Sequence, residues 1–257
     1  MPSRRVVLVT GAARRIGRSI ALDLAAHGFD LALHCHHASE EAAATAAELQ
    51  ALGARVAVLP ADLTDEAASR DLVPRALAQL GRLDAVVNNA SLFEHDDVAS
   101  FGHAAMERHW RANTAAPILL AQALHQHLAT RDDAAEMPGC VVNLLDQKLW
   151  NPNPDHLSYT LSKAALESAT TMLAMALAPR LRVVGVAPGV TLPSGPMNQA
   201  EFERAHRMTP LQRSSTPEDL ARTVRFVLDS PAITGTTILV DGGQHLAAQP
   251  RDVYFLA

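Results

Sequence analysis

Short apolar runs alternate with longer amphipathic stretches along the whole chain. Runs rich in valine, leucine and alanine predict strands at residues 6–9, 31–33, 55–59, 85–87, 140–145, 183–187 and 238–240. Apolar residues at three- and four-residue steps predict helices at 15–27, 40–52, 72–80, 105–110, 115–129, around Tyr159 and at 220–228. Near-continuous apolar strands separated by helices are typical of a parallel sheet covered on both faces. The pattern therefore predicts an α/β fold with a doubly wound parallel sheet.

Composition narrows the class of protein without indicating an activity. The chain has 257 residues, of which 48% are apolar, as expected for a single domain spanning 1–257. No apolar run approaches the roughly 20 residues of a membrane span, and no signal peptide opens the chain, which predicts a cytoplasmic protein. Cys35 and Cys140 lie in apolar runs and are expected to be buried, reduced thiols. The net charge of −5 argues against nucleic-acid binding, so local arginines would have to hold an anionic ligand.

A glycine-containing turn joins the first predicted strand to the first predicted helix. It reads Thr10-Gly11-Ala12-Ala13-Arg14-Arg15-Ile16-Gly17, with Arg15 where a middle glycine is usual. Strand, glycine turn and helix in this order form a Rossmann-type dinucleotide site, in which the helix N-terminus meets the pyrophosphate. The turn predicts cofactor-binding residues at Gly11, Arg14, Arg15, Ile16 and Gly17. Arg15 can contact phosphate oxygens and still reach whatever lies over the nicotinamide.

The end of the second strand decides which nicotinamide dinucleotide is expected. It reads His34-Cys35-His36-His37-Ala38-Ser39, without the carboxylate that would accept from the ribose diol of NAD. Together with Arg14, His36 and His37 therefore favour the 2′-phosphate of NADPH. Two alternatives stay open: a histidine metal site, which strand alternation disfavours because it separates His37 from His34 and His36, and an ordinary polar strand end. We predict NADPH and no metal.

Tyr159 and Lys163 stand four residues apart on a segment with helical periodicity. Side chains at this spacing lie on one face of a helix, so both can point into one pocket. A neighbouring ammonium favours the phenolate and is expected to lower the pKa of the tyrosine, which then can pass a proton near neutral pH. Alone, the pair could also be an ordinary surface pair.

Several further motifs follow in order along almost the whole chain. They are Asp62-Leu63, Asn88-Asn89-Ala90, Asn113, Tyr159 with Lys163, Pro188-Gly189 and Val240-Asp241-Gly242-Gly243. With these motifs the chain resembles the short-chain dehydrogenase/reductases. The resemblance implies that Asp62 and Leu63 line the adenine, that Asn89, Ala90 and Lys163 lie at the nicotinamide-side ribose, and that Asn113 orders a water in the proton path. It also implies cofactor contacts from Ser91, Leu144, Pro188 and Gly189.

Three departures from that family pattern resemble the pteridine reductases. Asp146 stands thirteen residues before Tyr159, where most relatives carry serine; Arg15 replaces a glycine; and Ser91-Leu92-Phe93 follows the Asn-Asn-Ala motif. This resemblance implies that Phe93 stacks on a pterin and that Arg15 lies near pterin and phosphates. The second strand differs, because His37 and Ala38 stand where pteridine reductases usually place arginine and serine.

These observations predict NADPH-dependent reduction of a C=N bond in a pterin or dihydropterin to the tetrahydropterin level. Asp146, Tyr159, Lys163 and Asn113 are the predicted catalytic residues, and Arg15, Ser91, Phe93, Asp146 and Tyr159 the predicted substrate-binding residues. A carbonyl reductase acting on a 3-oxoacyl group, ketone or sugar is the alternative within enzymes, and a non-catalytic NADPH-binding regulator the alternative outside them. We expect residues 191–208, rich in proline and glycine, to form a mobile substrate lid. The resemblance implies a homotetramer.

Overall fold

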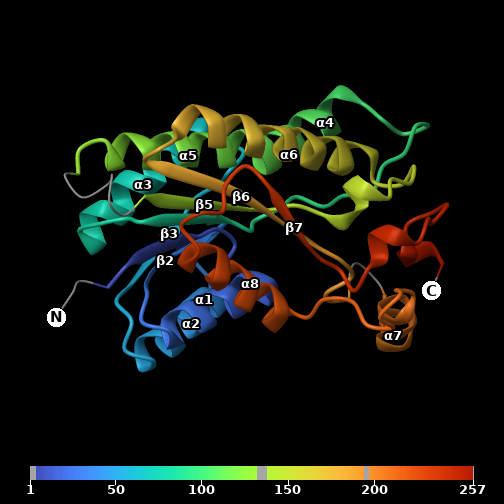
Figure 1. Cartoon of the computed structure of the whole chain (residues 1–257), viewed down its shortest axis with the longest axis horizontal. Coiled ribbons are helices and arrows are strands. Elements are labelled where there is room, and N and C mark those ends of the chain that lie inside the picture. The colour runs from blue at the N-terminus through green and yellow to red at the C-terminus, as the bar shows by residue number, and fades with distance from the viewer. Residues whose placement is uncertain (1–3, 132–137, 194–196, 257) are drawn as a thin grey trace.

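The computed structural model describes residues 4–131, 138–193 and 197–256, and its centre is a seven-stranded parallel sheet (Figure 1). The strand order is β3-β2-β1-β4-β5-β6-β7, with every neighbouring pair parallel. The order reverses between β1 and β4, which creates the crevice where doubly wound sheets bind ligands. The strands are β1 (Val6–Val9), β2 (Asp30–Cys35), β3 (Val56–Pro60), β4 (Ala85–Asn88), β5 (Gly139–Leu144), β6 (Leu181–Pro188) and β7 (Thr237–Val240).

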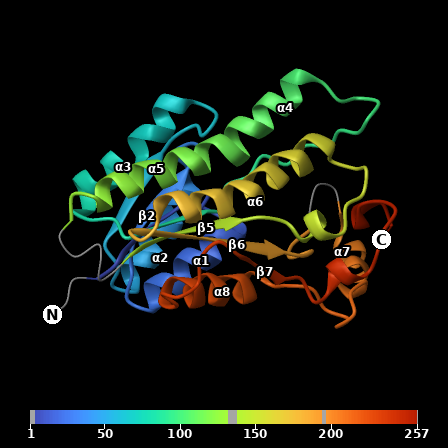
Figure 2. The ribbon, with the colours of Figure 1, turned by 45° about the horizontal axis from the view of Figure 1, so that its top comes forward.

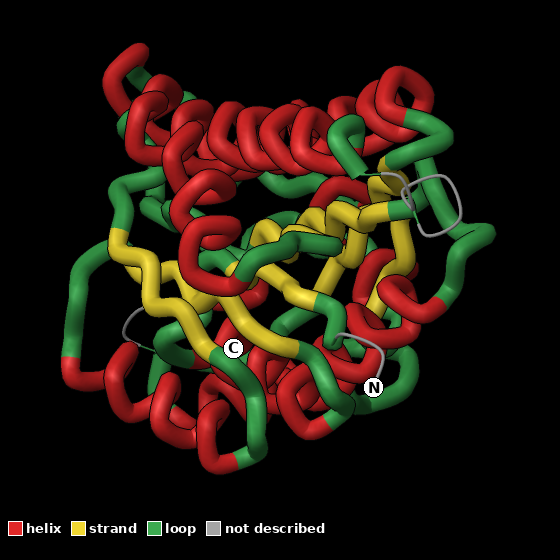
Figure 3. Tube along the Cα trace, turned by 90° about the vertical axis from the view of Figure 1, so that its left-hand side faces the viewer, coloured by secondary structure: helices red, strands yellow, loops and turns green. Residues whose placement is uncertain are grey.

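Helices cover both faces of the sheet, as an end-on view shows (Figure 3). One face carries α1 (Arg15–Ala26), α2 (Glu40–Ala51) and α8 (Pro217–Asp229). The opposite face carries α3 (Glu66–Leu80), α4 (His103–Trp110), α5 (Ala116–Leu128) and α6 (Leu157–Leu177). Figure 2 shows α4 and α5 end to end, with α6 beside them. A further helix, α7 (Gln199–Arg207), lies apart from both layers, beside the C-terminal residues.

Strand alternation divides the core between the two helical layers. Val7 and Val9 of β1 pack in the cluster that includes α1, α2 and α8, whereas Val6 and Leu8 pack with α3, α5 and α6. All four side chains are fully buried. Because successive strand residues point to opposite faces, such a strand must be apolar throughout, and this explains the unbroken apolar runs in the sequence.

The predicted start of one helix was wrong, and the predicted lid contains a helix that the sequence analysis did not assign; capping residues explain both helix starts. The helix predicted at 72–80 begins at Glu66, because Asp65 accepts from the backbone N–H groups of Ala67 and Ala68. The predicted lid contains α7, whose start is fixed by a capping box between Asn198 and Glu201. Gly195 and Pro196 of that segment lie outside the described residues, and the mobility of the segment stays a prediction.

Residues predicted as two separate helices form one continuous rod. A π-helical turn, η1 (Arg111–Ala115), joins α4 to α5 without a break. Such turns are frequent at functional sites because the extra residue re-aims a side chain. Here the turn carries Asn113.

Both cysteines are buried free thiols, Cys35 on β2 and Cys140 on β5. Burial raises the pKa of the Cys140 thiol to about 11, which keeps it protonated and unreactive at neutral pH. Of the helices in the described part of the chain, none combines the length and apolarity that a membrane span requires.

Candidate active site

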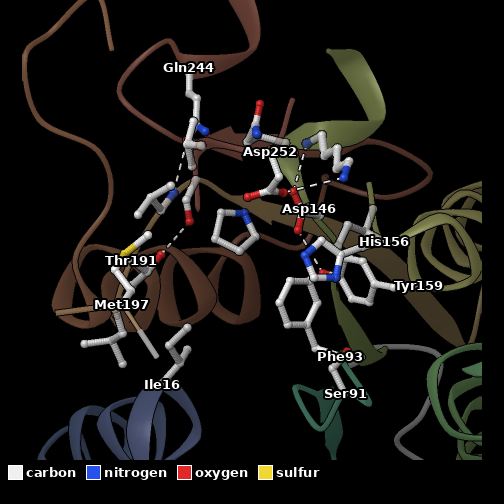
Figure 4. Close-up of a pocket in the computed structure, with 18 of the residues that line it drawn as sticks. Ile16, Ser91, Phe93, Asp146, His156, Tyr159, Thr191, Met197, Gln244 and Asp252 are labelled. Carbon is white, nitrogen blue, oxygen red and sulfur yellow. Dashed lines mark hydrogen bonds and ion pairs between the residues drawn. The ribbon is translucent and has the colours of Figure 1, made fainter. Parts of the chain in front are cut away.

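A cavity of about 660 Å³ opens at the carboxyl ends of the central strands (Figure 4). The end of β5 contributes Asp146, the start of α6 contributes Tyr159, the segment after β4 contributes Ser91 and Phe93, and the glycine turn contributes Arg15. The structure thus brings all five predicted substrate-binding residues to one cavity. Ile16, Pro188 and Gly189, predicted to contact the cofactor, line it as well.

Tyr159 and Asp146 form a direct pair at the cavity wall. The Tyr159 hydroxyl donates to Asp146 Oδ2 over 2.8 Å. The spacing of thirteen residues therefore does place a carboxyl group against the phenol. Ser158, the neighbouring hydroxyl, is buried elsewhere and donates to Asp96, so it does not replace the serine that most relatives carry.

The expected lowering of the tyrosine pKa is wrong for this structure. Burial and the adjacent Asp146 carboxylate raise the pKa of Tyr159 well above its usual value, because both disfavour a phenolate. The Lys163 ammonium donates to the Leu144 carbonyl over 2.6 Å and lies 5.9 Å from the centroid of the tyrosine ring. Burial lowers the pKa of Lys163 to about 8. In this state Tyr159 is a proton donor held by Asp146.

Asp146 itself sits where the carboxylate form is disfavoured. Burial raises its pKa, and the nearby negative charge of Asp252 adds to this effect. The backbone N–H of Lys148 donates to Asp146 Oδ1 over 2.8 Å and opposes the rise, as does the Tyr159 hydroxyl. Asp146 can therefore carry a proton at a higher pH than an ordinary aspartate.

Asn113 links the segment after β4 to the tyrosine helix. Its amide nitrogen donates to the Leu92 carbonyl over 2.9 Å and to Ser162 Oγ over 3.0 Å, while its oxygen accepts from the Leu92 N–H over 2.7 Å. Its side chain is buried and fully engaged in these contacts. Asn113 therefore fixes the position of the Ser91–Phe93 segment relative to α6.

Phe93 offers an aromatic face to the cavity. The residue is 45% exposed; its ring stacks on the imidazole of His156 with 4.2 Å between the ring centroids, and lies nearly perpendicular to the ring of Tyr159 with 4.7 Å between the centroids. His156 begins α6 in a left-handed conformation at φ 52°. A flat heterocycle lying on Phe93 would have its edge beside the Tyr159–Asp146 pair.

The glycine turn is tightly built against the segment after β4. Gly11 has φ 63°, and a Cβ on Gly17 would lie 2.2 Å from the Gly11 carbonyl oxygen, so the close turn needs both glycines. The Asn89 side chain donates to the Thr10 carbonyl over 2.9 Å and thereby ties the turn to β4. Arg15 also has a positive φ, 54°, and its guanidinium donates to the Pro193 carbonyl over 2.8 Å.

The histidines after β2 have two different environments. His34 is buried: its Nδ1 accepts from the Gly11 N–H over 3.1 Å and its Nε2 lies 3.0 Å from the Ala61 carbonyl oxygen. Burial lowers its pKa to about 4, so it is neutral and braces the turn. His36 and His37 are exposed, with rings 3.8 Å apart and His36 3.8 Å from Asp62. Within the described residues there is no cluster of metal-ligating side chains.

The remaining predicted cofactor residues follow the same edge of the sheet. Arg14 is exposed at the start of α1, Asp62 and Leu63 follow β3, and Ala90 follows β4, where its N–H donates to Thr10 Oγ over 3.0 Å.

Several side chains that line the cavity were missed by the sequence analysis. Gln147 and Lys148 directly follow Asp146, so their adjacency was a usable signal. The C-terminal residues gave no such signal, because only the fold returns them to the cavity. The missed residues are His95, Leu145, Gln147, Lys148, His156, Val190, Gln244, Asp252, Val253 and Phe255.

Comparison with known proteins places these features in a family. Residues 11–245 match the family described as enoyl-(acyl carrier protein) reductase. The chain is 34% identical to pteridine reductase 1 of Leishmania tarentolae, over 95% of this chain and 98% of that protein. It is 30% identical to the 3-oxoacyl-[acyl-carrier-protein] reductase FabG of Staphylococcus aureus, over 96% of this chain and 100% of that protein.

Solved structures show the same relationship. The crystal structure of FolM alternative dihydrofolate reductase 1 from Brucella canis, complexed with NADP, has a TM-score of 0.88 and 43% identity, covering 96% of both chains. Its counterpart from Brucella suis, also in complex with NADP, has a TM-score of 0.86 and 42% identity, covering 97% of this chain and 98% of that one. With its doubly wound sheet, its glycine turn and its Tyr159–Lys163 helix, the chain belongs to the short-chain dehydrogenase/reductase family and is similar within it to the pteridine reductases.

Proposed function

We propose that this protein is an NADPH-dependent reductase of the C=N bond of a pterin or dihydropterin, yielding the tetrahydropterin level. The observation that carries the proposal is the Tyr159 hydroxyl donating to the Asp146 carboxyl at 2.8 Å, beside the exposed face of Phe93. The similarity to a pteridine reductase and to two proteins named alternative dihydrofolate reductases supports it.

The glycine turn fits the phosphates of a dinucleotide. The first turn of α1 has no side-chain cap and no acidic residue, a feature shared by α4 and α6, whereas α2, α3, α7 and α8 have both. The amide N–H groups at the start of α1 are thus left for an anion, as in other dinucleotide sites. Arg14, His36 and His37 are exposed at the adenosine end and would hold the 2′-phosphate of NADPH.

NADPH, when bound, supplies the hydride for the carbon of the C=N bond. Phe93 would bind one face of the pterin and hold its reacting edge at Tyr159. The Tyr159 hydroxyl would give its proton to the substrate nitrogen, and the proton on Asp146 would replace it across their hydrogen bond. The raised pKa of Asp146 supports its role as this proton source, because it keeps the carboxyl protonated at a higher pH. Lys163, held by the Leu144 carbonyl, would compensate negative charge that develops on the phenol.

Turnover of NADPH with a dihydropterin tests the proposal. The absorbance of NADPH should fall with a dihydropterin and stay constant without it, and Tyr159→Phe should abolish the change while NADPH binding persists. A protein that binds NADPH and reduces no pterin would contradict the proposal.

Carbonyl reduction is the second candidate, favoured by the full-length similarity to a 3-oxoacyl reductase. A serine before the tyrosine can donate to a ketone oxygen throughout the reaction, whereas Asp146 becomes negatively charged once its proton has passed to Tyr159, and that charge opposes a developing alkoxide. Asp146 therefore weighs against this candidate. Assays of NADPH loss with a ketone or an acetoacetyl thioester, beside the dihydropterin, separate the two.

A further inference from the structure

The C-terminal residues fold back onto the loop between β5 and α6, and Asp155 of that loop holds them. Arg251 Nε lies 2.9 and 2.8 Å from the two carboxylate oxygens of Asp155, and the backbone N–H of Asp252 donates to the same carboxylate over 2.7 Å. The Asp155 side chain is only 4% exposed. These contacts, in which Asp155 is buried and Arg251 is half exposed, form a clasp that fixes where the C-terminal residues lie.

The clasp places part of the C-terminal segment in the cavity wall. Asp252, Val253 and Phe255 all line the cavity. Lys148 connects Asp252 to the proposed catalytic centre, because its ammonium lies 3.5 Å from the Asp252 carboxylate while its backbone N–H donates to Asp146. Figure 4 shows the carboxylate of Asp252 next to that of Asp146.

The chemistry of the proposed reaction brings the substrate's side chain to this place. In a dihydropterin, the nitrogen of the reduced C=N bond takes the proton and the carbon takes the hydride, and the same carbon carries the side chain. If Tyr159 protonates the nitrogen, that nitrogen lies at the Tyr159–Asp146 pair, and the carbon that carries the side chain is bonded directly to it. This places the start of the side chain at the end of the cavity that Asp146 and Asp252 both line.

The charges at this end of the cavity disfavour an anion. The Lys148 ammonium is already engaged by Asp252 and donates to the Asp155 carbonyl, and the Arg15 guanidinium donates to Pro193 at the glycine turn. A carboxylate on the substrate would meet the carboxylate of Asp252, whereas a hydroxyl could donate a hydrogen bond to it.

We propose that Asp252, held in the cavity wall by the Asp155–Arg251 clasp, is a specificity-determining residue that selects pterins with neutral, hydroxylated side chains against those with a carboxylate near the ring. This inference rests on the proposed pterin reduction. It names the class of substrate that the site takes.

Two stable oxidised pterins of nearly equal size provide the test. In hydroxymethylpterin the ring carbon that accepts the hydride carries a neutral hydroxymethyl group. In pterin carboxylate the same ring carbon carries a carboxylate group. Their dissociation constants are measured on NADP-saturated enzyme from the quenching of pterin fluorescence. The unmodified enzyme should bind the alcohol at least about tenfold more tightly than the carboxylate. Asp252→Asn should lower the ratio of the two dissociation constants, carboxylate over alcohol, by about three- to tenfold, because it binds the carboxylate more tightly.

Control variants separate a local effect from a change in net charge. Asp252→Glu keeps the charge and should keep the ratio, and Glu41→Gln removes an exposed charge on α2 outside the cavity and should also keep it. An unchanged ratio in Asp252→Asn, with dihydropterin turnover intact, would overturn this inference and leave the proposed function standing. Failure of both pterins to bind would overturn the proposed function and the inference together.

Discussion

The Tyr159–Asp146 pair gives the sharpest test of the proposed chemistry. Asp146→Asn keeps the size of the side chain and an oxygen that can accept from the Lys148 N–H, but it removes the carboxyl proton. After passing on its proton Asp146 is charged and accepts from Tyr159; a hydrogen bond to a charged group contributes about 1.5–3 kcal/mol, and 1.4 kcal/mol corresponds to a factor of ten. We therefore expect kcat with a dihydropterin to fall by about 10- to 150-fold. NADPH affinity should stay within about twofold, because Asp146 pairs with Tyr159 and Lys148 rather than with the glycine turn.

The pH dependence makes the same test more specific. Burial and Asp252 hold the pKa of Asp146 above its ordinary value, so the unmodified enzyme should lose activity as pH rises through that raised pKa. Asparagine has no proton to lose there, and the corresponding limb of the pH profile should disappear in Asp146→Asn. Stopped-flow assays of NADPH absorbance at several pH values measure both effects. Full dihydropterin turnover in Asp146→Asn, or a ketone that proves the far better substrate of the unmodified enzyme, would refute the reasoning.

Three further predictions concern Phe93, Arg14 and His34. Phe93→Ala should raise the KM for dihydropterin by about two- to tenfold from lost stacking, with NADPH affinity unchanged; a lower melting temperature alone would mean that Phe93 only packs. Arg14→Ala should reduce the preference for NADPH over NADH in kcat/KM, and equal use of both cofactors by the unmodified protein would contradict the assignment. His34 has a pKa of about 4 in the folded protein against 6.5 ordinarily, so the unfolded chain binds the extra proton between these values. The free energy of unfolding should therefore decrease by up to about 3 kcal/mol as pH falls through that range, and by less in His34→Gln. Chemical denaturation of both proteins at pH 4 and pH 7 measures the difference.

Much of the fold was predictable because each strand is buried on both faces. Strands such as β1 therefore read as continuous apolar runs, and the alternation with helices then indicates a parallel sheet. Helix starts were less predictable. The start of α3 depends on Asp65, an acid in a polar stretch, and the π-helical turn at Asn113 has no sequence pattern of its own.

Only those contacts of the site that follow from spacing along the chain could be predicted from the sequence. The spacing of thirteen positions from Asp146 to Tyr159 implied their contact, and the structure confirms the contact. The pKa of Tyr159 depends on which charge is nearest in space, and Asp146 rather than Lys163 is its partner. Asp252 lies more than a hundred residues from Asp146, and no local pattern could place it in the cavity. The cytoplasmic location and the homotetramer stay predictions.

Ionisable groups of opposite charge are paired at the buried end of the cavity, which lowers the cost of burying them. Two carboxyl groups, Asp146 and Asp252, share this end of the fold with two ammonium groups, Lys148 and Lys163. The ion pair of Lys148 with Asp252 leaves Asp146 and Lys163 to compensate each other, and Asp146 raises the pKa of Lys163 against the effect of burial. Removing one carboxyl group leaves an uncompensated positive charge, so Asp146→Asn and Asp252→Asn should not act independently. The kcat of the double variant should therefore differ from the product of the two single effects, whereas a simple product would show that the two carboxyl groups act separately.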